Sequence, residues 1–307
     1  MKYTEEYVKI NGIEQYFLHY ASNVETVLIM LHGGPGIPNS YGAYKLAPHL
    51  TFTNVVFYDQ RGAGKTRIRN NIDPAAISTE LFVEDLRQTV AYVKEKYQTD
   101  HIVLAGHSWG SQLGAEFVLK YPNDVKAFIA YGVVIDLKVQ EKIWYRRLKE
   151  LVYQTGKKRA IKRFERINPE YPNIPREEYI ASVPTLSSLE FKYGFHVNNV
   201  EKIYRKSPVM KLKDGMQMAT AEKFNHKLLG ELYDFNLRPV KEYQVPIFYI
   251  LGREDHWTAS TVAAEYFETF KAPTKALYWI EDAGHMTDTD QPEAFAEAVK
   301  DIVKQIK

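Results

Sequence analysis

Gly106-His107-Ser108-Trp109-Gly110 follows a short apolar run, Ile102-Val103-Leu104-Ala105, and leads into a segment whose apolar residues recur at three- and four-residue spacing. A serine with a glycine two residues away on each side, between a strand and a helix, is typical of a nucleophile elbow. The glycines are needed because a Cβ at either position would clash with the neighbouring strand or helix. We therefore expect the Ser108 hydroxyl at the carboxyl end of a sheet, beside the free N–H groups of a helix amino terminus.

Strand-like and helix-like segments alternate on both sides of this motif. Asn11-Gly12, a strong hairpin signal, joins two expected strands at the start of the chain. We expect the last helix to begin at Asp290, with Glu293 at capping-box spacing. The alternation predicts an α/β fold, a mostly parallel sheet with helices on both faces. The expected strands are 6–10, 13–20, 26–31, 54–58, 102–105, 127–134, 246–251 and 275–280, and the expected core helices include 81–97 and 260–270.

The stretch from Leu137 to Val240 interrupts this alternation. It is rich in tyrosine and phenylalanine, and prolines divide it into several helix-like segments. We interpret residues 137–240 as a helical cap inserted into a core formed by residues 1–136 and 241–307. The cap has 21 Lys and Arg against 12 Asp and Glu, a net charge of +9, while the core has a net charge of −7. This excess is either a solvated basic face or a field that attracts anionic substrates or partners.

Composition excludes several classes of protein. The chain has 307 residues, enough for one large α/β domain with an insertion. It has no cysteine, which excludes disulfides, thiolate metal sites and cysteine nucleophiles. Its first residues contain no apolar run, and its longest apolar stretch is too short to span a bilayer. We therefore expect a soluble, cytoplasmic protein with no membrane partner.

A serine hydroxyl becomes a good nucleophile only when a base accepts its proton and a third group orients that base. In this topology the acid and the histidine should follow the serine, each after a later strand. Asp255 comes just after the strand that ends at Leu251, and His285 just after the strand that ends at Ile280. The sequence therefore predicts the catalytic residues Ser108, Asp255 and His285.

Other residues of the same types compete for these roles. Glu254 adjoins Asp255, and Asp136 follows an earlier strand, so either is an alternative acid. The competing histidines lie beside glycine turns, in the cap or next to the predicted acid. They are His32, His107, His226 and His256.

Two hydrogen-bond donors are needed to stabilise the oxyanion of a tetrahedral intermediate. One is the backbone N–H of Trp109, the residue after the nucleophile. The second should come from the loop His32-Gly33-Gly34-Pro35-Gly36, where glycines allow close approach of the backbone. We predict Gly34 as this donor, although a plain glycine turn is the alternative.

Gly64-Lys65-Thr66 resembles the end of a phosphate-binding P-loop, but that motif needs a glycine five residues before Gly64. Position 59 is aspartate, which excludes this nucleotide site. No histidine–carboxylate cluster has the spacing of metal ligands. We therefore expect no metal, no cofactor and no nucleic-acid partner.

The combination of His32-Gly33-Gly34-Pro35-Gly36, Asp59-Gln60-Arg61-Gly62 and the serine motif, with Gly252-Arg253-Glu254-Asp255 and Gly284-His285, resembles the proline iminopeptidase family of α/β-hydrolases. The resemblance implies acyl transfer through a Ser108 acyl-enzyme, and a structural role for Asp59-Gln60-Arg61 in bracing the oxyanion loop. Family members hold the substrate's amino terminus with glutamates of the cap, and Glu222 is the candidate here.

The resemblance therefore implies an aminopeptidase that acts on a short peptide or another small molecule. The alternative is an esterase, lactonase or other amide hydrolase of the same fold, acting on a small and possibly anionic substrate. A non-catalytic binding protein on this fold is the third hypothesis.

Overall fold

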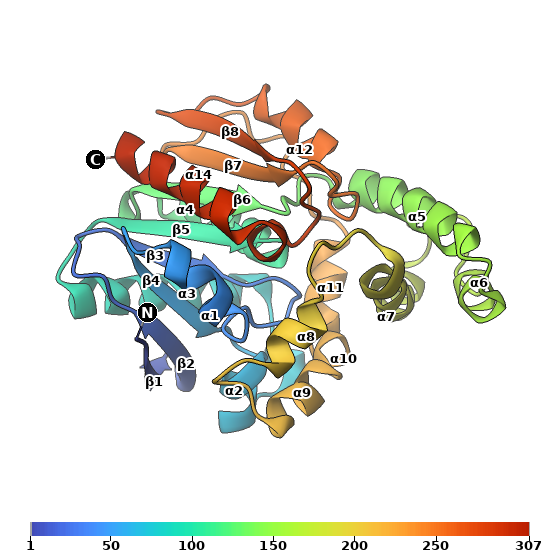
Figure 1. Cartoon of the computed structure of the whole chain (residues 1–307), viewed down its shortest axis with the longest axis horizontal. Coiled ribbons are helices and arrows are strands. Elements are labelled where there is room, and N and C mark those ends of the chain that lie inside the picture. Colours follow the sequence, from blue (N-terminus) through green and yellow to red (C-terminus); the bar gives the residue numbers. More distant parts are fainter. Residues whose placement is uncertain (1, 307) are drawn as a thin grey trace.

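A mixed β-sheet forms the centre of the protein (Figure 1), in a computed structural model that describes residues 2–306 without the side chains of residues 222 and 223. In this described part the strand order is β1-β2-β4-β3-β5-β6-β7-β8. β2 pairs antiparallel with β1 and β4, and the remaining neighbours pair in parallel. The predicted, mostly parallel sheet is confirmed. The strands are β1 (Thr4–Ile10), β2 (Ile13–Tyr20), β3 (Val27–Leu31), β4 (Asn54–Asp59), β5 (Ile102–His107), β6 (Ala127–Tyr131), β7 (Ile247–Gly252) and β8 (Lys275–Ile280).

Helices cover both faces of the sheet, as its continuous apolar strands predict. In β3, Val27, Ile29 and Leu31 belong to one apolar cluster, whereas Leu28 and Met30 belong to a second. This alternation arises because successive side chains of a strand point to opposite faces. The first cluster includes residues of α3 (Thr79–Tyr97), α4 (Trp109–Lys120) and α12 (Ser260–Phe267), and the second includes residues of α1 (Ala43–Leu46) and α14 (Pro292–Gln305). Short 3₁₀ helices lie at η1 (Ala47–His49), η2 (Pro74–Ala76) and η3 (Pro122–Asp124).

Most core elements begin and end within two residues of the predicted bounds, but β6 ends three residues before the predicted 134 and α12 three residues before the predicted 270. In the expected hairpin, Asn11 and Gly12 have φ angles of 43° and 83°, as a type I′ turn requires. The prediction for the last helix was wrong, because the short helix α13 (Thr287–Asp290) ends at Asp290 and α14 begins at Pro292. The Asp290 carboxylate does not cap α14, since it accepts the backbone N–H groups of Gly284 and Val197.

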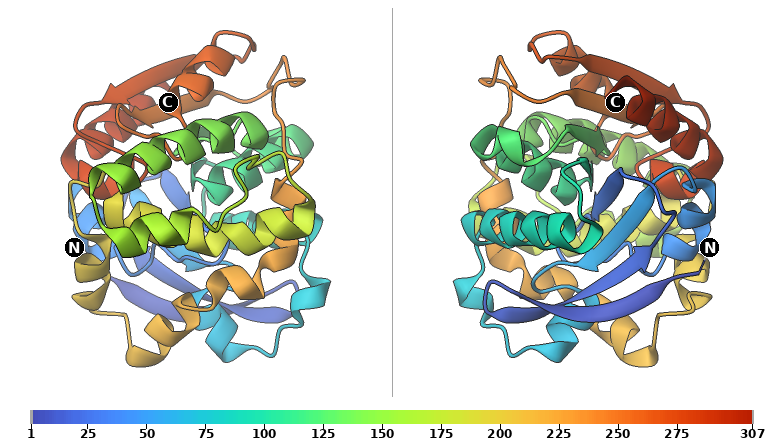
Figure 2. Two further views of the ribbon diagram at one scale, coloured as in Figure 1. Left: turned by 90° about the vertical axis from the view of Figure 1, so that its right-hand side faces the viewer. Right: turned by 90° about the vertical axis from the view of Figure 1, so that its left-hand side faces the viewer.

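Between β6 and β7 the chain leaves the sheet and forms the helices of the cap. In Figure 1, α5 to α7 lie to the right of the sheet, α8 to α10 lie lower in the view, and α11 lies to the left of α7. The left view of Figure 2 shows α5 and α7 packed side by side. Within the described residues, no helix is both long and apolar enough to cross a membrane. The division into core and cap as separate units stays a prediction. The cap helices are α5 (Leu137–Gln154), α6 (Lys158–Phe164), α7 (Arg176–Tyr193), α8 (Val200–Arg205), α9 (Leu212–Met218), α10 (Ala221–Phe224) and α11 (His226–Leu232).

Candidate active site

Ser108 occupies a sharp turn between β5 and α4. Its φ of 53° and ψ of −119° lie in a region that residues with a Cβ rarely adopt. A Cβ on Gly106 would come within 2.2 Å of the Gly110 carbonyl oxygen, and a Cβ on Gly110 within 2.2 Å of the Leu31 carbonyl oxygen. The helix therefore requires glycine at the first position, and the neighbouring strand requires it at the second.

Asp255 and His285 follow β7 and β8, and their side chains meet. His285 Nδ1 lies 3.2 Å from Asp255 Oδ2, and both side chains are almost completely buried. Asp255 also accepts the Thr258 backbone N–H on Oδ1 at 3.0 Å and the Thr258 hydroxyl on Oδ2 at 2.8 Å. Burial alone would raise the pKa of Asp255, but His285 and the bonds from Thr258 outweigh it and hold this pKa below its usual value. The carboxylate is therefore ionised beside the imidazole.

The two alternative acids have other partners. Asp136 accepts the Val139 backbone N–H at the start of α5 and lies 3.1 Å from the Arg238 guanidinium. Glu254 is half-exposed and lies 3.6 Å from His256. Of the three acids considered from the sequence, Asp255 is the one that contacts His285 in the described residues.

The competing histidines also have their own environments. His32 Nε2 accepts the backbone N–H of Gln60 at 3.0 Å, deep in the core. His107 Nε2 donates to the His285 carbonyl oxygen at 2.9 Å. Burial lowers the pKa of His107 to about 3, so this ring is neutral. His256 faces Glu254, and His226 lies exposed on α11.

Ser108 and His285 both lie beside the end of β6. The Ser108 backbone N–H donates to the Tyr131 carbonyl oxygen at 3.1 Å. At the next position, a Cβ on Gly132 would lie 2.9 Å from His285 Cε1. The His107 ring packs against the His285 ring, with 4.7 Å between their centroids. Ser108 and His285 also line the same cavity, and their pairing as nucleophile and base stays a prediction.

The predicted oxyanion donors, Gly34 and Trp109, line this cavity as well. Gly34 has a φ of 113°, and a Cβ there would lie 2.6 Å from the Gly36 nitrogen, so the loop requires glycine. A Cβ on Gly33 would lie 3.1 Å from the Ser108 Cβ, which places the loop directly against the nucleophile. Among the described residues, the backbone N–H groups of Gly34 and Trp109 have no acceptor. Their role as oxyanion donors stays a prediction.

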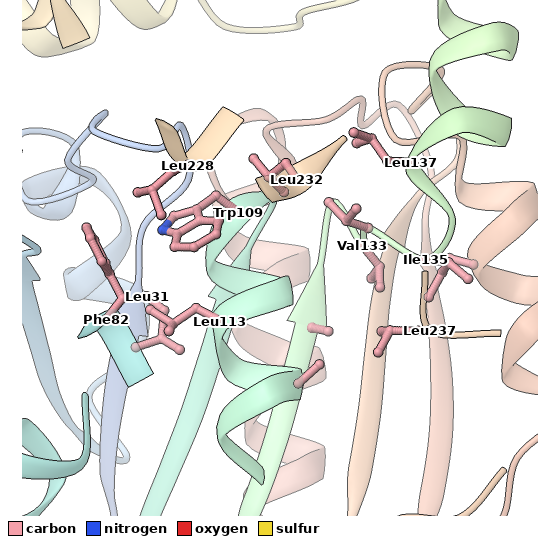
Figure 3. Packing of buried hydrophobic residues seen from close by; sticks show 14 of the residues in the cluster. Leu31, Phe82, Trp109, Leu113, Val133, Ile135, Leu137, Leu228, Leu232 and Leu237 are labelled. Atoms are coloured by element: carbon pink, nitrogen blue, oxygen red, sulfur yellow. The ribbon is translucent and has the colours of Figure 1, made fainter. Parts of the chain in front are cut away.

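Gln60 ties the oxyanion loop to the serine turn. Its backbone N–H donates to His32 Nε2 at 3.0 Å, and its side-chain amide donates to the His32 carbonyl oxygen at 3.1 Å. Its Oε1 accepts the Trp109 indole N–H at 2.9 Å. Figure 3 shows the Trp109 ring beside Phe82 of the core and Leu228 of the cap. These contacts agree with the bracing role expected for this segment.

Gly64-Lys65-Thr66, the segment excluded as a nucleotide site, begins α2 (Gly64–Arg69) and joins the core to the cap. The Lys65 backbone N–H donates to Asp59 Oδ2 at 2.8 Å, and the Thr66 hydroxyl donates to the Asp59 carbonyl oxygen at 2.6 Å. The Lys65 ammonium lies 3.4 Å from Asp214 Oδ2 on α9, and both side chains are buried. The residues that resemble a P-loop therefore have structural partners.

A cavity of about 720 Å³ lies between the core and the cap. Ser108 and His285 line it from the core, and residues of α5, α7, α8 and α9 line it from the cap. The wall beside His285 is aromatic, because the Trp257 ring lies 4.9 Å from the imidazole and stacks on Trp144 at 5.2 Å. The site is thus a largely apolar pocket, as is typical of small-molecule sites, and its lining also includes the charged side chains of Lys45, Glu141, Glu201, Arg205 and Asp288.

Two buried carboxylates of the cap were missed in the sequence. Glu141 of α5 lines the cavity and accepts the hydroxyls of Tyr171 at 2.5 Å and Tyr179 at 3.3 Å. Burial raises the pKa of Glu141 to about 7, although both hydroxyls oppose the rise. Glu190 of α7 accepts the Trp144 indole N–H at 2.8 Å, and burial raises its pKa as well. In the described part of the chain, no Lys, Arg or His nitrogen lies within 4.0 Å of either carboxylate.

The sequence does contain a signal for Glu141. This residue shares the buried stripe of α5 with Leu137, Trp144 and Leu148, and an acid in such a stripe is rare unless it has a partner. The residue that the sequence suggested instead, Glu222, lies in α10, but its side chain is outside the described residues. Its contact with substrate therefore stays a prediction.

Known proteins resemble this chain over nearly its full length. Proline iminopeptidase of Heyndrickxia coagulans is 27% identical over 317 aligned residues, covering 99% of this chain and 100% of that protein. A probable aminopeptidase of Bacillus subtilis is 24% identical and covers 95% of this chain and 91% of that protein. The structure of a proline iminopeptidase-related protein from Thermus thermophilus superposes with a TM-score of 0.71 at 20% identity, covering 100% and 99% of the two chains. At that identity the last comparison shows the fold alone.

A family model described as serine aminopeptidase, S33, matches residues 22–292. The match includes the serine turn, both strands that precede Asp255 and His285, and the whole cap. The predicted α/β-hydrolase fold and the resemblance to proline iminopeptidases are both confirmed. The chain belongs to the serine aminopeptidase S33 family and is an α/β-hydrolase similar to the proline iminopeptidases.

Proposed function

We propose that this protein is a serine hydrolase that releases the amino-terminal residue from short peptides or amides, as a proline iminopeptidase does. The contact between Asp255 and His285, on the wall of a cavity that also contains Ser108, carries this proposal. An ionised carboxylate on Nδ1 leaves Nε2 as the proton acceptor, which is the state that a serine nucleophile needs.

In the proposed reaction, Ser108 Oγ attacks the acyl carbon of the substrate while His285 Nε2 takes the hydroxyl proton. The oxyanion that forms accepts hydrogen bonds from the backbone N–H groups of Gly34 and Trp109. Asp255 stabilises the imidazolium, which then gives its proton to the leaving amine. Water hydrolyses the acyl-enzyme by the same proton path and restores the serine.

Glu141 supports the aminopeptidase over an esterase. Its carboxylate lines the cavity, is buried, and has only neutral donors as partners among the described residues. A buried carboxylate that has only neutral donors as partners is stabilised by a ligand that brings a positive charge. The protonated amino terminus of a substrate is such a ligand, and Glu190 is a second acid in the same part of the cap.

A substrate panel tests this assignment. Prolyl-, alanyl- and phenylalanyl-arylamides are compared with their N-acetylated forms and with simple acyl esters, and Ser108→Ala is the inactive control. We expect cleavage of free-amine arylamides and much slower cleavage of the acetylated forms.

Two results would contradict the proposal at different levels. Strong ester turnover without cleavage of any free-amine arylamide would favour the alternative, a hydrolase of small and possibly anionic esters drawn by the basic cap. Failure of a fluorophosphonate to label Ser108 would contradict the serine mechanism itself.

A further inference from the structure

Thr258 lies where Asp255 and His285 meet. Its Oγ1 is 2.8 Å from Asp255 Oδ2 and 3.2 Å from His285 Nδ1. His285 Nδ1 in turn is 3.2 Å from Asp255 Oδ2. The three atoms therefore form a closed triangle in which every side is a hydrogen-bond distance.

One arrangement of protons satisfies this triangle. An ionised carboxylate can only accept, and if the Thr258 hydroxyl donated to Nδ1 instead, neither group would donate to Asp255 Oδ2. The single hydroxyl proton is therefore donated to Asp255 Oδ2. The lone pairs of the hydroxyl then face His285 Nδ1, so that nitrogen carries the ring proton and shares it between two acceptors. With Nδ1 protonated, the lone pair of the neutral ring lies on Nε2.

We propose that Thr258 is a positioning residue of this active site, whose hydroxyl holds His285 in the tautomer and orientation that leave Nε2 free for the Ser108 proton. The inference rests on the proposed function, because it assigns a role in that reaction. It adds a fourth side chain to the predicted nucleophile, base and acid.

The surroundings of Thr258 hold it firmly in place. The residue is 6% exposed, and its backbone N–H donates to Asp255 Oδ1 at 3.0 Å. Its carbonyl oxygen accepts the side-chain amide of Gln140, which also donates to the Val133 carbonyl oxygen at 2.8 Å. Gln140 belongs to α5, the first helix of the cap. A β-branched side chain on a fixed backbone has few rotamers, so the hydroxyl keeps its direction.

Two substitutions separate the hydroxyl from the rest of the side chain. Thr258→Val keeps the branched shape and the backbone N–H but removes the hydroxyl, whereas Thr258→Ser keeps the hydroxyl and removes the methyl group. Thr53→Val is the matched control, since Thr53 is fully buried and its hydroxyl donates to the Thr26 carbonyl oxygen at 3.0 Å, away from the cavity.

The experiment measures three quantities on folded protein: the rate of Ser108 labelling by a fluorophosphonate, kcat and KM on a cleaved arylamide, and the proton resonance of His285 Nδ1–H. Thr258→Val removes a hydrogen bond to a charged group. We therefore expect a loss of about 10- to 100-fold in labelling rate and kcat, with little change in KM. The resonance should move in that variant. Thr258→Ser should restore most of each quantity, and Thr53→Val should alter none of them.

The outcomes distinguish this inference from the proposed function. If the wild type is labelled and Thr258→Val is labelled equally fast with the same resonance, Thr258 has no positioning role, but the serine mechanism stands. If Thr258→Val and Thr258→Ser lose equal activity, the methyl packing matters and the hydroxyl does not, which also overturns the inference. A wild type that is not labelled overturns both.

Discussion

Asp255 of the core and Glu141 of the cap are both buried carboxylates, at 3% and 7% exposure, yet their partners differ. Asp255 faces an imidazole and the hydroxyl of Thr258, and its pKa stays below the usual value against the effect of burial. Glu141 faces two tyrosine hydroxyls, and burial raises its pKa to about 7. The two carboxyl groups are buried to a similar degree, but their pKa values shift in opposite directions. The neighbouring groups therefore decide whether each carboxyl group is charged.

This difference suggests what each carboxylate is for. In the proposed mechanism Asp255 stabilises a positive charge that the protein itself forms, when His285 takes up a proton. Glu141 has no such internal charge beside it in the described residues, and we propose that the positive charge comes from a bound substrate. Under this proposal the core supplies the chemistry, and the cap selects the substrate.

The largest expected effect tests the role of Asp255 in the core. Asp255→Asn should lower kcat about 10⁴-fold, because the imidazole loses its tautomer and its charge partner. Ser108→Ala and His285→Ala should each lower kcat by about as much or more, and their effects should not add. Steady-state kinetics on the best arylamide measures these losses. Asp136→Asn is the matched control, and severe damage there with a mild Asp255→Asn would show that the acid was assigned wrongly.

The second largest effect tests the role of Glu141 in the cap. Glu141→Gln should raise KM for free-amine arylamides by about 10- to 100-fold, since a hydrogen bond to a charged group is lost. Turnover of N-acetylated or ester substrates should stay near that of the wild type. Glu150→Gln is the control on the same helix, because Glu150 is exposed and pairs with Arg147 at 3.1 Å. Equal losses on charged and uncharged substrates would contradict a role in binding the ammonium.

A smaller effect concerns the pH dependence of binding. The Glu141 carboxylate is charged above its pKa of about 7, and an α-amino group is protonated below about pH 8. KM for a free-amine substrate should therefore be lowest between these values and rise as the pH falls through 7. The rise on the acidic side should disappear in Glu141→Gln. A KM of the wild type that stays flat from about pH 6 to 8 would contradict the prediction.

The smallest effect concerns stability. Glu141 binds its proton more tightly in the folded chain than in the unfolded chain, where its pKa has the ordinary value of 4.5. The folded state therefore holds more protons between about pH 4.5 and 7, and the free energy of unfolding should fall as the pH rises through this window. The contribution is on the order of 3 kcal/mol at most. Urea unfolding at both ends of the window should show a shallower slope in Glu141→Gln, and an unchanged slope would refute the shift.

Local sequence was sufficient wherever a local pattern determines the structure. The apolar strands, the Asn11-Gly12 turn and the glycines around Ser108 were predicted because each depends on residues close to it in the chain. Chain order was enough to favour Asp255 over Asp136. Thr258 was not singled out, because its importance appears only when the loops after β7 and β8 meet.

Glu141 and Asp290 show the same limit. The two tyrosines that contact Glu141 come from later cap segments, so its burial could not be read from α5 alone. Asp290 has the local pattern of a helix cap, but the backbone N–H groups of Gly284 and Val197 recruit its carboxylate instead. A tertiary contact here prevails over a local preference.

The backbone conformation of Ser108 affects which substitutions we expect at this position in evolution. Its φ of 53° is a conformation that glycine adopts freely and serine adopts under strain. A Gly at this position should therefore give a more durable fold and an inert enzyme, since stabilising changes at functional sites tend to remove activity. In relatives that no longer need the reaction, we expect Ser108 to be among the first residues replaced, with glycine as the favoured substitute.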